Sequence, residues 1–446
     1  MTAYEDKQAR LTASLAAAGA GGGFGLAKPT SNLFRDRAAR ARPRVDLSNF
    51  NTVLSVDPVA GTVDAEGMTT FVDLADATLA HGTMPAVVPQ LKSITLGGAV
   101  AGVGIEATSF RHGLVHENIA KMDVLVGDGR VVTCSADNEH RDLFYGFPNS
   151  YGTLGYALRL TARTLPVKRY VEVSHRTFDT PIAFFAALEE SLGDGAIDFL
   201  DGVVFAKNAM VLSSGRFVDD APYASDYTYE RIYYRSLRER GVDYLATSDY
   251  LWRWDTDWFW CSKNLGAQNP LLRRVYGRSR LNSIFYQKVM RWNSRWKLGA
   301  ALERMRGLNA ESVIQDVDIP LANAAEFLAF MHAEVGVLPI WICPIRSPAA
   351  GADYPLYPLR PGTPYVNFGF WDRVTSPEAR PPGYLNRKVE HKVTELGGIK
   401  SLYSDSYFTE SEFWSIYNKP AYDALKAKYD PGRALPDLYA KCVLKR

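Results

Sequence analysis

The sequence contains little cysteine and no long apolar run. None of its four cysteines stands in a CxxC pair or beside a histidine at metal-ligand spacing, so we expect reduced thiols and no bound metal. Nowhere do about 18 apolar residues follow one another, so no membrane-spanning helix is expected. The first ten residues carry acidic side chains and no apolar stretch, which argues against a signal peptide and favours a cytoplasmic protein. The cysteines are Cys134, Cys261, Cys343 and Cys442.

Net charge is nearly absent as well. The 51 Lys and Arg side chains against 49 Asp and Glu leave +2, which predicts no general affinity for nucleic acid. A composition that is 47% hydrophobic and 22% charged is typical of a folded globular protein. Two domains are expected for 446 residues, because a single core rarely grows that large.

Short strand-like and helix-like segments alternate along the chain, which predicts an α+β fold. Alternating or β-branched runs indicate strands, and apolar residues spaced by three and four indicate helices. Gly-Asp-Gly at 127–129, between two strand-like runs, predicts a β-hairpin. Strands are predicted at 53–56, 62–65, 122–126, 130–134, 155–165, 170–178, 198–212, 313–319, 339–344 and 365–372, and helices at 69–79, 182–191, 322–335 and 411–428.

A glycine-rich segment from Pro89 to Gly113 is the strongest functional signal. Its five glycines let backbone N–H groups approach a ligand where a Cβ would collide, and the hydroxyl groups of Thr95, Thr108 and Ser109 add donors. Such donors neutralise a pyrophosphate without a lysine. Turns between strands are the structural alternative. The spacing does not fit a Rossmann turn, and the Gly-Lys-Ser/Thr of a P-loop is missing.

The order Pro-x5-Thr-x-Gly-Gly from Pro89, then Gly-x-Gly, Ser-x3-Gly and an Asp-Gly hairpin, resembles the FAD-binding domain of the vanillyl-alcohol-oxidase (PCMH-type) flavoproteins. Residues 142–155 resemble the second FAD-contacting stretch of that superfamily. The resemblance implies FAD, held without a covalent bond because residues 28–35, where the first FAD loop belongs, contain no His or Cys. The residues implied in cofactor binding are Thr95, Gly97, Gly98, Gly102, Gly104, Thr108, Ser109, His112, Gly113, Gly152 and Gly155.

From about residue 45 to the C-terminus the chain is also similar to the Δ24-sterol reductase family within that superfamily. The matching segments are 84–89, 102–106, 313–317, 338–344, 402–407 and 412–414. This similarity implies FAD-dependent reduction of an isolated carbon–carbon double bond, with a nicotinamide nucleotide as electron donor. In two respects the sequence departs from the family: the N-terminal membrane segment of sterol reductases is not found here, and the first FAD loop matches poorly.

These resemblances divide the chain into four parts. We expect a flexible lead-in at 1–27, the PCMH-type FAD-binding domain at 28–166, an α+β substrate or cap domain at 167–400, and a C-terminal segment at 401–446 that packs back near the flavin.

Reducing an unactivated alkene requires a hydride and an acid that keeps its proton at neutral pH. Tyr403 and Tyr407 are the first candidates for proton donor and flavin-edge contact, and core packing is the alternative for one of them. Glu106, the third catalytic candidate, either hydrogen-bonds a ribose, acts as an acid near the flavin, or forms an ion pair. His112 either touches the flavin or caps a turn. Asp316 lies in a predicted strand and is interpreted as structural.

Trp341, Arg346 and Lys400 are the substrate-binding candidates. The two cations are suited to stabilising a reduced flavin anion or to holding a carboxyl or phosphate group of the substrate. A solvated surface position is the alternative for Lys400.

Residues 249–306 form a basic aromatic region. Six of the nine tryptophans fall between 252 and 296, and ten Lys or Arg stand against Glu303 alone between 270 and 306. This composition predicts peripheral contact with the inner face of a membrane, from which a lipid substrate would be drawn. A basic helix over an aromatic core is the alternative, and no nucleic-acid motif accompanies the region.

The sequence therefore predicts an FAD- and NADPH-dependent reductase of a lipid double bond. Two substrates compete: a methylene-branched fatty acyl chain (10-methylene to 10-methyl), as in related actinobacterial enzymes, and a Δ24-sterol side chain. The Ala-, Arg- and Gly-rich composition favours the first. The alternatives are an FAD-dependent oxidase or dehydrogenase of an alcohol, sugar or lactone hydroxyl, and a flavin-binding scaffold or lipid carrier. No oligomeric state is predicted.

Overall fold

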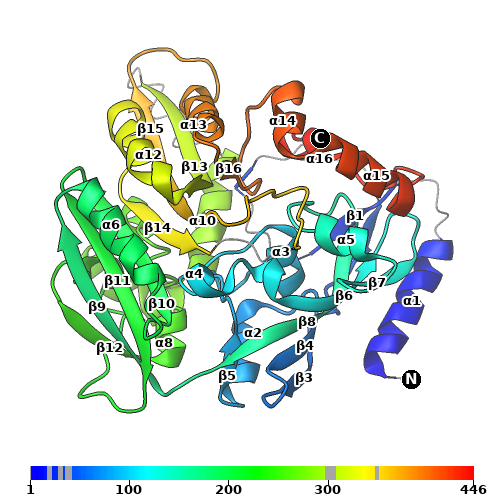
Figure 1. Cartoon of the computed structure of the whole chain (residues 1–446), viewed down its shortest axis with the longest axis horizontal. Coiled ribbons are helices and arrows are strands. Elements are labelled where there is room, and N and C mark those ends of the chain that lie inside the picture. The colour runs from blue at the N-terminus through cyan, green and yellow to red at the C-terminus, as the bar shows by residue number, and fades with distance from the viewer. Residues whose placement is uncertain (1, 18–22, 29–33, 36–42, 297–307, 347–350) are drawn as a thin grey trace.

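The computed structural model describes residues 2–17, 23–28, 34–35, 43–296, 308–346 and 351–446. Two antiparallel sheets, each packed against helices, make up most of the molecule (Figure 1). Beside the smaller sheet lies a short parallel pair, β1 (Gly25–Ala27) and β2 (Arg44–Asp46). This mixture of helices and antiparallel strands confirms the predicted α+β fold.

Among the described residues, the smaller sheet has six strands in the order β3-β4-β8-β6-β7, with β5 beside β8. The predicted hairpin at 127–129 is confirmed by the antiparallel pairing of β6 with β7. Helix α2 begins where Thr70 Oγ1 accepts a hydrogen bond from Asp73 N. The elements are β3 (Val53–Asp57), β4 (Thr62–Glu66), α2 (Phe71–Leu79), β5 (Thr83–Pro85), α3 (Leu96–Ala101), α4 (Ser109–His112), the 3-10 turn Val115–Asn118, β6 (Ile119–Leu125), β7 (Val131–Ser135), α5 (Arg141–Gly146) and β8 (Tyr156–Pro166).

The larger sheet has eight strands within the described part of the chain, in the order β12-β9-β11-β10-β14-β15-β13-β16. Its strands are β9 (Tyr170–Phe178), β10 (Phe199–Ala206), β11 (Ala209–Val218), β12 (Val242–Ala246), β13 (Asn309–Pro320), β14 (Ile340–Ile345), β15 (Tyr365–Ser376) and β16 (Ile399–Lys400).

Side-chain alternation gives the larger sheet two different faces. Val317 and Phe368 point to one face and join a core cluster with residues of α6 (Pro181–Leu192), α12 (Ala324–Phe330) and α13 (Tyr384–Glu395). Asp316, Asp318 and Gly369 are offset by one residue and therefore point to the opposite face. We call this second face, which lies toward the smaller sheet, the inner face.

The remaining elements connect the two sheets or follow them. Between β11 and β13 they are α7 (Tyr233–Ser236), α8 (Thr247–Leu251), the 3-10 turns Cys261–Leu265 and Arg278–Arg280, α9 (Pro270–Tyr276) and α10 (Ser283–Trp296). The 3-10 turn Leu321–Asn323 and the π turn Met331–Val335 flank α12. The chain ends in α14 (Glu410–Ile416), α15 (Lys419–Tyr429) and α16 (Leu438–Cys442).

Two predicted segments are confirmed and divided by the structure. The strand-forming residues predicted at 198–212 belong to the hairpin of β10 and β11. The helical residues predicted at 411–428 form two helices, α14 and α15. The break occurs at Asn418, which adopts a positive φ of 48° and caps α15 by accepting a hydrogen bond from Ala421 N.

The N-terminal residues also differ from the flexible lead-in expected at 1–27. Residues 3–17 form helix α1 (Ala3–Ala17), and 18–22 lie outside the described residues. Tyr4 is buried, and its hydroxyl donates a 2.7 Å hydrogen bond to Asp123 Oδ2 of β6. Lys7 Nζ lies 2.7 Å from the buried Glu66 carboxylate. These contacts attach α1 to the smaller sheet.

A buried charge cluster joins the glycine-rich segment to the larger sheet. Arg253 Nη2 lies 2.8 Å from Glu106 Oε1 and 2.9 Å from Asp201 Oδ2 of β10, and all three side chains are buried. Alongside it, the backbone N–H groups of Leu200 and Arg346 donate to the carbonyls of residues 107 and 109. Of the alternatives for Glu106, the structure places it in an ion pair.

We predict that Arg253→Met destabilises the protein strongly, because it leaves two carboxylates buried without a counter-charge. The free energy of unfolding should fall by about 3–5 kcal/mol. Arg216→Met is the matched control, since Arg216 pairs with Glu172 near the surface and should cost at most about 1 kcal/mol. Urea unfolding followed by tryptophan fluorescence measures both, and equal losses would contradict the assignment.

Candidate functional site

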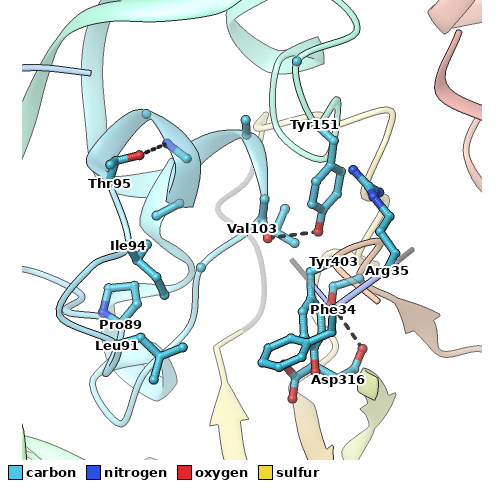
Figure 2. Close-up of a pocket in the computed structure, with 18 of the residues that line it drawn as sticks. Phe34, Arg35, Pro89, Leu91, Ile94, Thr95, Val103, Tyr151, Asp316 and Tyr403 are labelled. Atoms are coloured by element: carbon cyan, nitrogen blue, oxygen red, sulfur yellow. Dashed lines mark hydrogen bonds between the residues drawn. The ribbon is translucent and has the colours of Figure 1, made fainter. Parts of the chain in front are cut away.

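A cavity of about 490 Å³ lies between the glycine-rich segment and the inner face of the larger sheet. Figure 2 shows Pro89, Leu91, Ile94 and Thr95 on one side of it. Tyr151, Arg35, Phe34, Tyr403 and Asp316 stand on the other side. Segments from both ends of the chain and from both sheets therefore meet at one space.

Close backbone packing forms the first wall. Thr95 caps α3 by accepting a hydrogen bond from Gly98 N at 3.2 Å. Gly97 N donates to Gly67 O at 2.9 Å, and a Cβ on Gly97 would stand 2.9 Å from that oxygen. Glycine is needed here because the two backbones approach so closely. The segment thus contributes its glycines to the cavity wall together with apolar side chains such as Leu91 and Ile94.

The second glycine stretch continues this wall. Tyr151 N donates to Ala101 O at 3.2 Å and its hydroxyl donates to Gly102 O at 3.3 Å, which ties this stretch to the end of α3. Gly152 has φ of 75°, and a Cβ there would stand 2.8 Å from the Tyr156 ring. A larger residue at this position would be strained and would also displace a ring that lines the cavity.

Basic side chains stand next to both glycine stretches. Lys28 Nζ lies 3.5 Å from where a Cβ on Gly98 would be, and Lys441 Nζ lies 3.6 Å from the same point on Gly152. Lys441 Nζ also donates to Tyr151 O at 2.6 Å. The sequence interpretation invoked backbone and hydroxyl donors alone, and the structure adds these two lysines beside them. Two ammonium groups give this end of the cavity positive charge, which suits an anionic ligand.

Two carboxyl groups occupy the opposite wall, on the inner face of β13. Asp318 accepts hydrogen bonds from the Tyr357 hydroxyl at 2.6 Å and from Asn367 Nδ2 at 2.7 Å. Burial raises the pKa of Asp318 to about 6. Burial, and then the nearby charge of Asp318, raises the pKa of Asp316 to about 7. Near neutral pH this wall therefore holds a carboxyl group, Asp316, that still carries a proton in part of the molecules, next to the more acidic Asp318.

Aromatic side chains surround these carboxyl groups. Tyr403 lies beside Asp316, and burial followed by the Asp316 charge raises the pKa of its hydroxyl well above the ordinary value. Phe34 packs edge-on against Tyr403 with 5.8 Å between ring centroids. The rest of this wall is indole and phenyl surface from Trp258, Phe259, Trp341 and Trp371. This wall therefore combines aromatic surface with two carboxyl groups.

Comparison with known proteins identifies the smaller-sheet part of this site. Residues 30–135 match the family described as FAD binding domain. The chain carries an FAD-binding domain. It is also similar to the Delta(24)-sterol reductase of Homo sapiens, with 26% identity over 411 residues that cover 89% of this chain and 77% of that protein. The match to the Delta(24)-sterol reductase of Arabidopsis thaliana is 25% identical over 420 residues and covers 86% and 74% of the two chains.

A more local similarity links the chain to cytokinin dehydrogenase 7 of Oryza sativa subsp. japonica, 31% identical over 147 residues, or 32% of this chain. These findings confirm the predicted resemblances to PCMH-type flavoproteins and Δ24-sterol reductases. Together they support an FAD-dependent oxidoreductase. The actinobacterial branch stays a prediction.

Most of the residues expected to hold FAD do line the cavity. They are Thr95, Gly97, Gly98, Gly102, Gly104, Gly152 and Gly155. The other four are not among its lining residues. Thr108 Oγ1 donates to Ala86 O at 2.7 Å, and Ser109 Oγ accepts from Glu106 N at 3.2 Å. Gly113 packs on Glu117, and His112 is half-buried, where burial lowers its pKa. These four residues therefore pack behind the residues that line the cavity.

The catalytic and substrate-binding candidates also separate. Tyr403 and Trp341 line the cavity, and Glu106 does not. Tyr407 packs its ring on Gly383, away from it. Lys400 is not solvated, because it is fully buried in a 2.8 Å ion pair with Glu390. Arg346 pairs with Glu117 at 3.0 Å. The structure therefore leaves both cations outside the cavity.

The residues that we missed are the carboxyl pair and the lysines. Alternation in 313–319 puts Asp316 and Asp318 on the face opposite Val313 and Val317, and this was the available signal. Lys441 carries no such signal, because its contact with Tyr151 spans 290 residues.

These residues fit FAD. A backbone cradle and two ammonium groups suit its pyrophosphate, and the aromatic wall suits a flat ring system. Asp316 Oδ1 and Tyr403 Oη are buried without a hydrogen-bond partner of good geometry, so both atoms can still form a hydrogen bond with a ligand.

We predict that Gly152→Ala reduces the FAD content of the purified protein. Gly82→Ala is the matched control, because Gly82 has a similar φ of 71° but a Cβ there would meet nothing within 4 Å. Both changes should cost about 1 kcal/mol of backbone strain. Only the first should lower the ratio of flavin to protein absorbance, and an equal effect would contradict the assigned wall.

Proposed function

We propose that the protein reduces an isolated carbon–carbon double bond of a lipid, with electrons from NADPH passing through FAD. The observation that carries this proposal is a cavity in which the glycine cradle faces a wall of aromatic rings and carboxyl groups. The cation on that side, Arg35, is engaged with Leu402 O and the Tyr151 ring, and the indole and phenyl surface suits an apolar chain. The similarity to reductases covers 89% of this chain.

The proposed substrate is either a Δ24-sterol side chain or a 10-methylene fatty acyl chain. The relatives named Delta(24)-sterol reductase support the first. The composition of the chain supports the second. Both present the same chemistry to the wall, an unactivated alkene in an aliphatic chain, so one experiment with two substrates separates them.

In this proposal Thr95, the glycine stretches, Lys28 and Lys441 would hold FAD. When bound, FAD supplies a hydride to one carbon of the alkene. The indole and phenyl side chains orient the aliphatic chain and exclude water from it. A proton must reach the second alkene carbon from a group on the wall of the larger sheet, where Tyr403 was the first candidate. Tyr407 and Glu106 are not among the residues that line the cavity.

We predict that NADPH bleaches the flavin absorbance under anaerobic conditions and that a lipid alkene restores it. Purified protein is mixed in a stopped-flow instrument with NADPH and then with vesicles containing either a Δ24 sterol or a 10-methylene phospholipid. The product should gain two mass units from the substrate that reacts. Bleaching by an alcohol or lactone but not by NADPH would show an oxidase or dehydrogenase instead. Bound FAD without any turnover would show a scaffold or carrier.

Peripheral membrane contact is proposed for part of the basic aromatic region. Leu271 and Val275 of α9 are 72% and 76% exposed, and Leu272 is 47% exposed. The helix is fixed from beneath by Arg273, which is buried and lies 2.7 Å from Asp257, next to the cavity wall. Exposed basic residues lie in α9 at Arg274 and after it at Arg278, Arg280 and Lys288. No helix among the described residues is long and apolar enough to cross a membrane.

We predict that Val275→Ser weakens binding to vesicles containing anionic lipid. Ile182→Ser is the matched control, because Ile182 is 78% exposed on α6, outside this region. Burying a side chain of this size in the interface contributes about 1.5 kcal/mol or more, so the first change should weaken binding about tenfold. Co-sedimentation measures both variants, and an equal effect would contradict the proposed contact.

A further inference from the structure

Asp316 and Asp318 stand on the same wall but are held differently. Asp318 has a donor on each oxygen, from Tyr357 and Asn367. Asp316 Oδ1 is buried without a hydrogen-bond partner, and no cation pairs with the Asp316 side chain within the described ranges. A carboxyl group that retains bonding capacity on a cavity wall is available to a ligand.

Space for the Asp316 carboxyl is provided by the neighbouring strand. Gly369 of β15 stands directly opposite Asp316 in the antiparallel register. A Cβ at position 369 would lie 2.6 Å from Asp316 Oδ1, which is closer than any normal contact. An alanine there would force the carboxyl to move. The glycine at position 369 therefore leaves room on the inner face for the Asp316 carboxyl, and a larger residue at 369 would occupy that space.

The groups that face Asp316 act in both directions on its protonation. Asp318 on the same strand favours the neutral form, whereas the Tyr403 hydroxyl beside it favours the carboxylate. Tyr151, from the second glycine stretch, lies near enough for the Asp316 charge to raise its own pKa. Arg35 lies over the Tyr151 ring, 4.8 Å from its centroid, and its Nη1 donates to Leu402 O. Burial and the Asp318 charge together raise the pKa of Asp316 to about 7. The Tyr403 hydroxyl has a pKa well above its ordinary value, so it is the weaker acid of the two.

We propose that Asp316 is the acid that protonates the alkene, that Asp318 keeps it protonated, and that Tyr403 positions it. This inference rests on the proposed function. The O–H bond of Asp316 breaks while a C–H bond forms with the electron pair of the double bond. The other carbon takes the hydride that NADPH supplies through FAD, and Asp316 regains its proton from solvent. The sum is one alkene, one NADPH and one proton giving one saturated chain and NADP⁺.

The test separates the two half-reactions of the FAD-loaded protein in anaerobic stopped flow. In Asp316→Asn, flavin reduction by NADPH should stay within about twofold of wild type, because no proton reaches the alkene in that step. Reoxidation by the lipid that reacts, a Δ24 sterol or a 10-methylene phospholipid, should fall about 100-fold or more. Gly369→Ala should also slow reoxidation, because it moves the carboxyl without removing it. Asp372→Asn, near the exposed end of β15, is the control that changes neither step.

The pH dependence provides a readout that a structural role would not change. Wild-type reoxidation should fall tenfold per unit as the pH rises above about 7, because Asp316 then loses its proton. Asp316→Asn should not show this limb. In Asp318→Asn the limb should move to lower pH, because removing a negative neighbour eases ionisation of Asp316.

Thermal unfolding gives a second, independent measurement. Because the pKa of Asp316 is higher in the folded state, its contribution to stability is complete below about pH 4 and is lost as the pH rises through about 7. The melting temperature of Asp316→Asn should therefore decline less than that of wild type across this range.

If wild-type reduced flavin is reoxidised by neither lipid, the proposed function fails and the acid role with it. If wild type is reoxidised and Asp316→Asn matches its rate, this inference alone is overturned.

Discussion

The site depends on a buried ionic contact between two parts of the chain. Glu106 ends the segment that forms the first cavity wall, and Asp201 belongs to the sheet that forms the second. Arg253 binds both, and its guanidinium stacks 4.1 Å from the centroid of the Tyr250 ring. Desolvating three charges costs much of what their attraction returns, so the net gain in stability is modest. The contact instead fixes where the two walls stand relative to each other.

The local features of this site could be predicted from the sequence, and the long-range ones could not. Glycine spacing predicts positions where the backbone packs closely, because a close backbone approach excludes Cβ atoms there, and these glycines do line the cavity. The hydroxyls of Thr108 and Ser109 bond backbone groups instead of lining the cavity, and local sequence does not distinguish the two situations. Lys441 reaches the site from the other end of the chain. Local spacing does not encode such a contact.

Composition alone also did not separate the two interpretations of the basic aromatic region. In its described part, Trp254, Trp258 and Trp260 are almost fully buried, as the core interpretation requires. Leu271 and Val275 of α9 are exposed, as a membrane-facing helix requires. Both patterns occur within 25 residues, because one side of this segment closes the cavity and the other meets solvent. Only the fold decides which side chain belongs to which side.

The burial of the cavity carboxyl groups also bears on the direction of the redox reaction. Oxidising a hydroxyl requires a base that is ionised before it takes the proton, whereas reducing an alkene requires an acid that still holds one. An aromatic wall without a paired cation disfavours the ionised form of Asp316, and the neighbouring Asp318 disfavours it further. The environment that weakens this group as a base suits it to donate a proton near neutral pH. On electrostatic grounds alone, the cavity is better suited to reduction than to oxidation.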